Sequence, residues 1–202
     1  MSIRRVGRAS ARPAPALDAL GANRYSPCMD DPRYPIGKAV IDKEPTPEKR
    51  AACIRDIAEL PALLRGAVKG LTDAQLDTPY RDGGWTVRQL VHHVADSHMN
   101  AFIRFKLALT EQNPAIKPYN QDAWVTTADA ALGVETSLAV LDGVHARLAR
   151  LLSSMDAAAF ARTFMHPENG LTSLDRNLQI YAWHGKHHAA HVTALRARKG
   201  WG

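Results

Sequence analysis

The sequence lacks long apolar runs, and it contains only two cysteines, Cys28 and Cys53. A membrane-spanning helix needs about 20 consecutive apolar residues. No stretch of this chain approaches that length, so we expect no membrane segment. Two cysteines do not make a disulfide framework, and their spacing is not that of a metal-binding pair. These absences exclude a small disulfide-stabilised secreted scaffold and favour a reducing, cytoplasmic compartment.

The chain also lacks an internal repeat and the strong apolar-polar alternation that is typical of half-buried strands. Its 202 residues, of which 46% are hydrophobic and 23% charged, suffice for one domain with a hydrophobic core. We therefore expect a globular domain built mainly from helices.

The net charge of +6 is concentrated at the start of the chain. In residues 1–24 five arginines stand against one acid, Asp18, which leaves +4 there and only +2 in the remainder. A charge confined to one tail is not the basic patch that binds nucleic acid, so we expect no nucleic-acid partner. The five are Arg4, Arg5, Arg8, Arg12 and Arg24.

Residues 1–27 are rich in Arg, Ala, Ser and Pro and show no periodicity. Such a segment buries too little apolar area to offset its ordering entropy, so we predict a disordered basic tail followed by one domain over 28–202. The composition fits an organellar transit peptide. It fits equally well a start codon assigned too far upstream, with Met29 as the true start.

Four long helical segments follow the tail. The first is predicted from an N-cap at Thr46 to about Gly70, and Pro61 should kink it. The second opens on the capping box of Thr86 and Gln89 and runs to about 110. The third spans 135–153, and the fourth runs from 172 or 173 to about 199. A shorter turn opens at 72, and a turn or small hairpin is expected at 167–170. The prediction is an all-α four-helix bundle.

The stretch WHGKHHAAH, residues 183–191, places four histidines on the last predicted helix. They fall within an arc of about 100° at 100° per residue. Two pairs have the i, i+4 spacing that lets two imidazoles bind one ion, His184 with His188 and His187 with His191. The interruption of the cluster and its place inside an amphipathic helix argue against a purification tag. Solvated or hydrogen-bonded histidines on a polar face are the alternative.

A metal ion needs a third ligand, and the second predicted helix offers two candidates. His98 lies in the middle of its apolar stripe, either as a ligand on the bundle axis or as a hydrogen-bonded core residue. His93 lies on a polar flank shared with Arg104, either as a ligand or as a surface residue. Periodicity leaves both open. His92 lies on the opposite flank, and His145 and His166 are isolated in the sequence.

Two further residues of this helix are candidates for supporting roles. Arg104 shares the side that carries His93 and could hold an anionic group of a substrate, or it forms a surface ion pair. Asp96 could orient a histidine through its ring N–H, or it is a solvated acid. No residue pattern identifies a general base.

Longer segments of the sequence resemble the DinB/YfiT superfamily of helical-bundle metal proteins, and the YfiT branch in particular. They are YPIG (34–37), LDTPYRDGGWTVRQLVHHVADSHMNAFIRFKLALTE (76–111), PAIKPY (114–119) and YAWHGKHHAAH (181–191). The resemblance implies an up-down-down-up four-helix bundle, a homodimer, and one divalent ion per subunit, zinc or nickel, bound by His93, His184 and His188. It argues against His191, which is often Gln in the superfamily. Lys186 departs from the branch, where a histidine is expected, at a position that is not a ligand.

The resemblance implies a metal-dependent hydrolase acting on a small molecule, because an ion held by three neutral imidazoles lowers the pKa of bound water to about 7. Thiol S-transfer is the alternative, since the superfamily includes enzymes that use low-molecular-weight thiols such as bacillithiol or mycothiol, and an ion holds a thiol as the nucleophilic thiolate. A metal-stabilised binding module without catalysis is the third reading.

Overall fold

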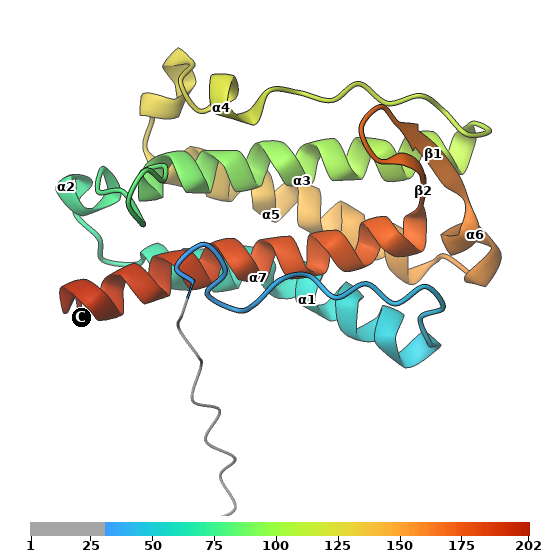
Figure 1. The fold of residues 1–202 in the computed structure, drawn as a ribbon, viewed down its shortest axis with the longest axis horizontal. Helices are drawn as coiled ribbons and strands as arrows, with labels where there is room; N and C mark the ends of the chain where they lie inside the picture. The colour runs from blue at the N-terminus through green and yellow to red at the C-terminus, as the bar shows by residue number, and fades with distance from the viewer. Residues whose placement is uncertain (1–30) are drawn as a thin grey trace, which may run out of the picture.

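The computed structural model describes residues 31–202, so the predicted disordered tail, Cys28 and the domain boundary at residue 28 lie outside the described residues. Four long helices dominate the described part (Figure 1). They are α1 (Pro47–Val68), α3 (Val87–Thr110), α5 (Val134–Ser153) and α7 (Leu174–Lys199). Shorter elements connect them: α2 (Asp73–Leu76), α4 (Gln121–Trp124), the 3₁₀ helix η1 (Ala128–Ala131), α6 (Ala157–Ala161), β1 (Thr163–His166) and β2 (Gly170–Ser173).

The predicted up-down-down-up order is confirmed. In Figure 1, α1 and α7 run in one direction and α3 and α5 in the other. The parallel pair α3 and α5 is joined by the long connection over 111–133, which crosses the length of the bundle and contains α4 and η1. α7 packs mainly against α1 and also against α3. The two helices that carry His93 and His184 are therefore neighbours.

The helices begin where the side-chain caps predict. Thr46, Thr86 and Ser173 each accept a hydrogen bond from a backbone N–H of the first turn, and Thr86 forms the full capping box with Gln89. The first helix continues through Pro61, which is buried in its interior. The expected hairpin is present, with β1 and β2 antiparallel and His166 opposite Gly170.

The apolar core consists of two clusters, one toward each end of the bundle. On α3 the first cluster ends at Ala95 and the second begins at Ala101. The same change occurs on the other helices, between Ile57 and Leu60 on α1, Leu141 and Leu148 on α5, and Ala182 and Ala189 on α7. Between the clusters lie buried histidines from three helices, His98, His145 and His188. A polar layer therefore crosses the middle of the bundle.

The helices α1 and α7 approach each other closely at Gly185, between the two histidines of one pair. A Cβ atom at this position would overlap the side chain of Leu60 and lie 2.7 Å from its Cδ1. A larger residue there would force the Leu60 side chain or the two helices to shift. On the other side of α7, the segment 31–45 runs along the helix, where the Trp183 indole donates to the Gly37 carbonyl and Gln179 exchanges two hydrogen bonds with the Asp42 backbone. None of the helices in residues 31–202 is both long enough and apolar enough to cross a membrane.

Candidate metal centre

The loop before α3 and the first turns of that helix place His93. The sequence YRDGGW (80–85) turns at Gly83, which has a positive φ of 65°, and delivers Trp85 to the start of the helix. The Trp85 ring lies 4.6 Å from the His93 ring, centroid to centroid, and its indole donates to Asp122 Oδ1 at 3.2 Å. His93 is therefore only 3% exposed although it lies on the polar flank of α3.

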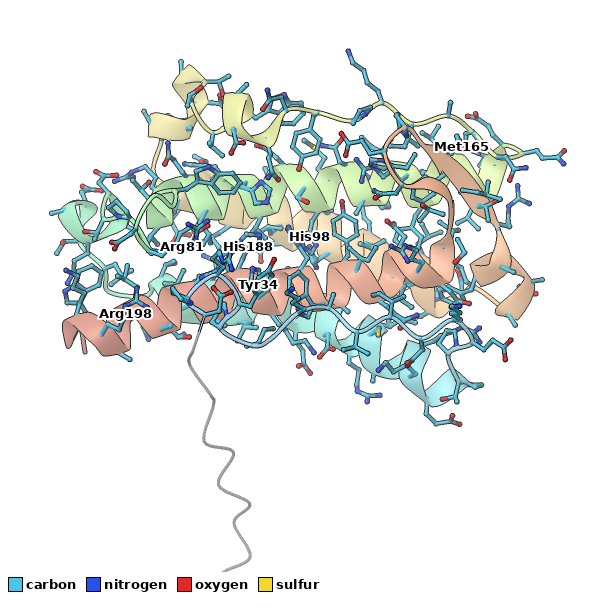
Figure 2. All side chains as sticks on the ribbon, viewed as in Figure 1. Tyr34, Arg81, His98, Met165, His188 and Arg198 are labelled. Carbon is cyan, nitrogen blue, oxygen red and sulfur yellow. The ribbon has the colours of Figure 1, made fainter. Side chains whose placement is uncertain are left out.

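Three imidazoles meet between α3 and α7. The Nε2 atom of His184 lies 3.3 Å from that of His93 and 3.1 Å from that of His188. One ligand atom of each ring lies within 4.8 Å of the others. His93 and His188 are buried, and His184 is partly exposed. Figure 2 shows His188 in the middle of the bundle, between α3 and α7. The structure thus brings together the three residues that the resemblance implies as ligands.

All three rings are uncharged at neutral pH. Burial lowers the pKa of His93 to about 4. Burial, and then the charges of neighbouring histidines, lower the pKa of His184 and His188 well below the usual value of 6.5. Neutral imidazole is the form that binds a metal ion, because its second ring nitrogen carries a lone pair.

The trio fits a divalent ion. In a tetrahedral site with metal–nitrogen bonds of 2.0–2.1 Å, two nitrogens lie roughly 3.3 Å apart, which matches the 3.3 Å and 3.1 Å separations. Hydrogen bonds among the three rings would satisfy these nitrogens less well than an ion. A ring nitrogen of neutral imidazole either donates or accepts, and His184 Nε2 lies close to two other Nε2 atoms. The Nδ1 atoms of His93 and His188 are buried without a hydrogen-bond partner among the described residues. One ion would satisfy all three Nε2 lone pairs.

His98, for which periodicity left open a ligand role and a core role, is a buried neighbour of His184. Its Nε2 lies 3.2 Å from His184 Nδ1, and the residue is fully buried. Its ring stacks on His145 of α5 at 4.9 Å, and His145 Nδ1 lies 2.5 Å from the Ile57 carbonyl oxygen of α1. Ligand imidazoles in metal proteins are generally fixed by such a hydrogen bond on the second ring nitrogen. His98 therefore fixes the orientation of the His184 ring.

The remaining histidines have other partners. His187 and His191 lie with their Nε2 atoms 3.1 Å apart, and Trp183 stacks on His187. His92 contacts Ser137 Oγ and the Leu132 carbonyl, which is a structural role. His166 lies in the hairpin, where its Nδ1 accepts from the Glu168 N–H.

Arg104 and Asp96, the two candidates for supporting roles, have different surroundings. Arg104 forms no ion pair with a carboxylate in the described part of the chain and donates to the Tyr181 hydroxyl at 3.2 Å. Burial raises the pKa of Asp96, but in residues 31–202 its carboxylate makes no hydrogen bond with a histidine. The orienting role considered for Asp96 falls to His98.

Sequence reasoning missed His145, which was treated as isolated. A signal was present: His145 continues the apolar stripe of α5 formed by Leu138, Leu141, Leu148 and Leu152, all of which are fully buried. Trp85 and Tyr181 were also missed as neighbours of the trio. Both lie inside the segments that carry the family resemblance, but neither has a spacing that relates it to a histidine on another helix.

Several known proteins are similar to this chain. The sequence profile of the DinB superfamily matches residues 56–192. A protein of Bacillus cereus (strain B4264) named "Putative metal-dependent hydrolase" is 52% identical over 173 residues, which cover 86% of this chain and all of that protein. A Bacillus thuringiensis relative of the same name is 51% identical over the same shares.

Two solved structures are also similar. YfiT from Bacillus subtilis, described as "a probable metal-dependent hydrolase with an unusual four-helix bundle topology", is 47% identical with a TM-score of 0.82, over 85% of this chain and 99% of that one. The four-helix bundle protein TT2238 has a TM-score of 0.50 at 22% identity, over 73% of this chain and 98% of that one, and shows the fold alone. By the match of the family profile and of these relatives over most of its length, the chain belongs to the DinB superfamily.

Proposed function

We propose that this protein is a metal-dependent hydrolase of a small-molecule substrate, with one divalent ion, zinc or nickel, bound by His93, His184 and His188. The observation that carries the proposal is the convergence of three neutral imidazole nitrogens at the spacing of a tetrahedral ligand set. No fourth His, Cys, Asp or Glu joins the group in the part of the chain that the structure describes. Three protein ligands with one open position are typical of catalytic rather than structural zinc sites. The names of the relatives support the same function.

The bound ion would supply a water of lowered pKa, about 7, as the nucleophile for hydrolysis. Two residues of the chain shield and orient the ligands. Trp85 covers one side of His93 and keeps it out of water. His98 holds the ring of His184 through Nδ1, which leaves the His184 Nε2 lone pair directed at the centre of the trio. Because His184 is the partly exposed member, substrate would approach on its side.

The first test is metal content by mass spectrometry on untagged protein, for the wild type and for His93→Ala and His188→Ala. We expect about one zinc or nickel ion per chain in the wild type and a loss of the ion in both variants. His191→Ala is the matched control, because it removes a buried histidine of α7 that lies outside the trio. A wild type that holds no metal and keeps its stability in the presence of a chelator would refute the proposal.

The second test distinguishes the reaction. Hydrolysis predicts turnover of ester or amide substrates without added thiol, and loss of turnover in His93→Ala. Turnover that appears only when a thiol and an electrophile are both present would replace hydrolysis by thiol S-transfer. Metal binding with neither activity would leave a structural ion. The homodimer expected from the family is a separate prediction, which light scattering of the purified protein tests.

A further inference from the structure

Arg104 lies on α3 on the same side as His93, eleven positions later, which is roughly 16 Å along the helix axis. Its side chain reaches across to α7, where Nη1 donates to the Tyr181 hydroxyl at 3.2 Å. Tyr181 is buried, stands one turn before His184, and its ring lies 5.7 Å from the His184 ring. The guanidinium thus contacts a residue whose ring lies beside that of His184, the partly exposed member of the trio.

The surroundings of Arg104 contain hydroxyl and imidazole groups but no paired acid. Burial raises the pKa of Tyr119, and the charge of Arg104 opposes that rise. Burial lowers the pKa of His166, and the charge of Arg104 lowers it further. Both pKa values therefore depend on the charge of Arg104. The acids of the same region, Asp96 and Glu168, form no ion pair with it within 4.0 Å.

Two other shielded arginines, Arg50 and Arg88, are paired with acids. Two more that are partly buried, Arg81 and Arg196, form no ion pair within residues 31–202 and donate to backbone carbonyls instead. Arg50 binds both oxygens of Asp175, at 2.6 and 2.8 Å. Arg88, which is 8% exposed, contacts Asp73 and Asp77 at 2.8 and 2.6 Å. A guanidinium has five N–H donors, and the only hydrogen bond of Arg104 within residues 31–202 uses one of them. A partly buried charge without a partner is unfavourable in itself. The position is therefore suited to an anion that comes from outside the chain.

We propose that Arg104 and the Tyr181 hydroxyl bind a carboxylate group of the substrate, which makes small carboxylic acids with a hydrolysable ester or amide bond the substrate class. A carboxylate takes two parallel hydrogen bonds from a guanidinium. Tyr181 accepts from Arg104 and keeps its own O–H to donate to the same carboxylate. The substrate then extends from this anchor toward His184, with its reacting bond at the trio. This assignment rests on the proposed hydrolase function.

The test uses monomethyl succinate, which carries one carboxylate and one ester, and dimethyl succinate, which carries no charge. Calorimetry measures the binding of both to the purified protein, and the release of methanol measures hydrolysis. We expect the wild type to bind the monoester preferentially. Arg104→Gln should weaken that binding about 10- to 100-fold, because hydrogen bonds to a charged partner are lost, and leave the diester unaffected. Tyr181→Phe should lose a smaller factor.

Two further variants separate a local effect from misfolding. Arg104→Lys keeps the charge without the planar fork, so it should fall between the wild type and Arg104→Gln. Arg55→Gln is the control, because Arg55 is exposed on α1 and should not change the binding. Equal affinity of the wild type for both esters, no affinity for either, or wild-type affinity in Arg104→Gln would overturn the proposal.

The same measurements distinguish a failure of the carboxylate site from a failure of the hydrolase function. Binding of the monoester that depends on Arg104 and persists in His93→Ala, without methanol release in the wild type, keeps the carboxylate site and refutes hydrolysis. Release of methanol from both esters at equal rates keeps hydrolysis and refutes the carboxylate site.

Discussion

Replacing His98 should weaken metal binding although His98 is not a ligand. When His184 binds an ion through Nε2, its proton must be on Nδ1, and that buried N–H needs an acceptor. His98 Nε2, at 3.2 Å, is that acceptor. In the metal-free protein the proton of His184 can move to the other nitrogen. Loss of the acceptor therefore destabilises the metal-bound state more than the metal-free state.

The size of the effect follows from this hydrogen bond. A buried donor left without a partner costs about 1–3 kcal/mol. Since each 1.4 kcal/mol is a factor of ten in an equilibrium constant, His98→Leu should raise the dissociation constant of the ion roughly 5- to 150-fold. His98→Gln keeps an acceptor oxygen on a side chain of similar reach, so its dissociation constant should stay within about threefold of the wild type.

Competition with a chromophoric chelator measures both dissociation constants, and circular dichroism confirms that both variants are folded. Absorption of the cobalt-substituted proteins adds a spectrum that reports ligand geometry independently of affinity. The reasoning is refuted if His98→Leu binds the ion as tightly as the wild type. It is refuted equally if folded His98→Leu and His98→Gln lose affinity to the same extent, because the hydrogen bond would then not be the cause.

Three other perturbations have defined outcomes. Saturation with metal at 100 times its dissociation constant should stabilise the protein by about 2.7 kcal/mol, seen as a rise in Tm that a chelator reverses and that His93→Ala lacks. Burial lowers the pKa of His93 from 6.5 to about 4, so in the metal-free protein the free energy of unfolding should decline by about 3 kcal/mol as the pH falls from 6.5 through 4. Urea titrations should show a flatter pH profile of this free energy for His93→Leu, and an unchanged profile would contradict the assignment. Gly185→Ala should lower the free energy of unfolding by about 1–3 kcal/mol through overlap with Leu60, and Leu60→Ala in the same chain should cost less than the sum of the two single changes.

Most of the bundle was predictable because helix ends are determined locally. The capping residues Thr46, Thr86 and Ser173 lie within three residues of the groups they bond, so the sequence contains the whole interaction. The long helices follow the predicted ranges closely, and α5 begins at Val134, one residue before the prediction. The short elements α4, η1 and α6 were not predicted, since each has only four or five residues and shows no helical periodicity.

The site was only partly predictable from periodicity. A helical wheel shows that four histidines share one face of α7, but not which pair α3 contacts. It also left His93 and His98 open, because the rotation of α3 about its axis is set by packing. The structure gives each a different role: His93 joins the trio through Nε2, and His98 supports His184 through Nδ1. The family resemblance selected the trio. Neither the helical wheel nor the resemblance indicated that His98 stacks on His145 or that His145 contacts the Ile57 carbonyl.

The separation of the trio along the chain has a consequence for the order of synthesis. His93 precedes His184 by 91 residues, and no two neighbouring helices in sequence complete the group. A nascent chain therefore contains only one of the three ligands, on α3, for the whole time that the connection, α5 and the hairpin are being made. An ion would be captured by all three rings only after α7 has emerged from the ribosome and docked. Metal acquisition would then report that the entire bundle has been assembled, and a truncated chain would not retain the ion.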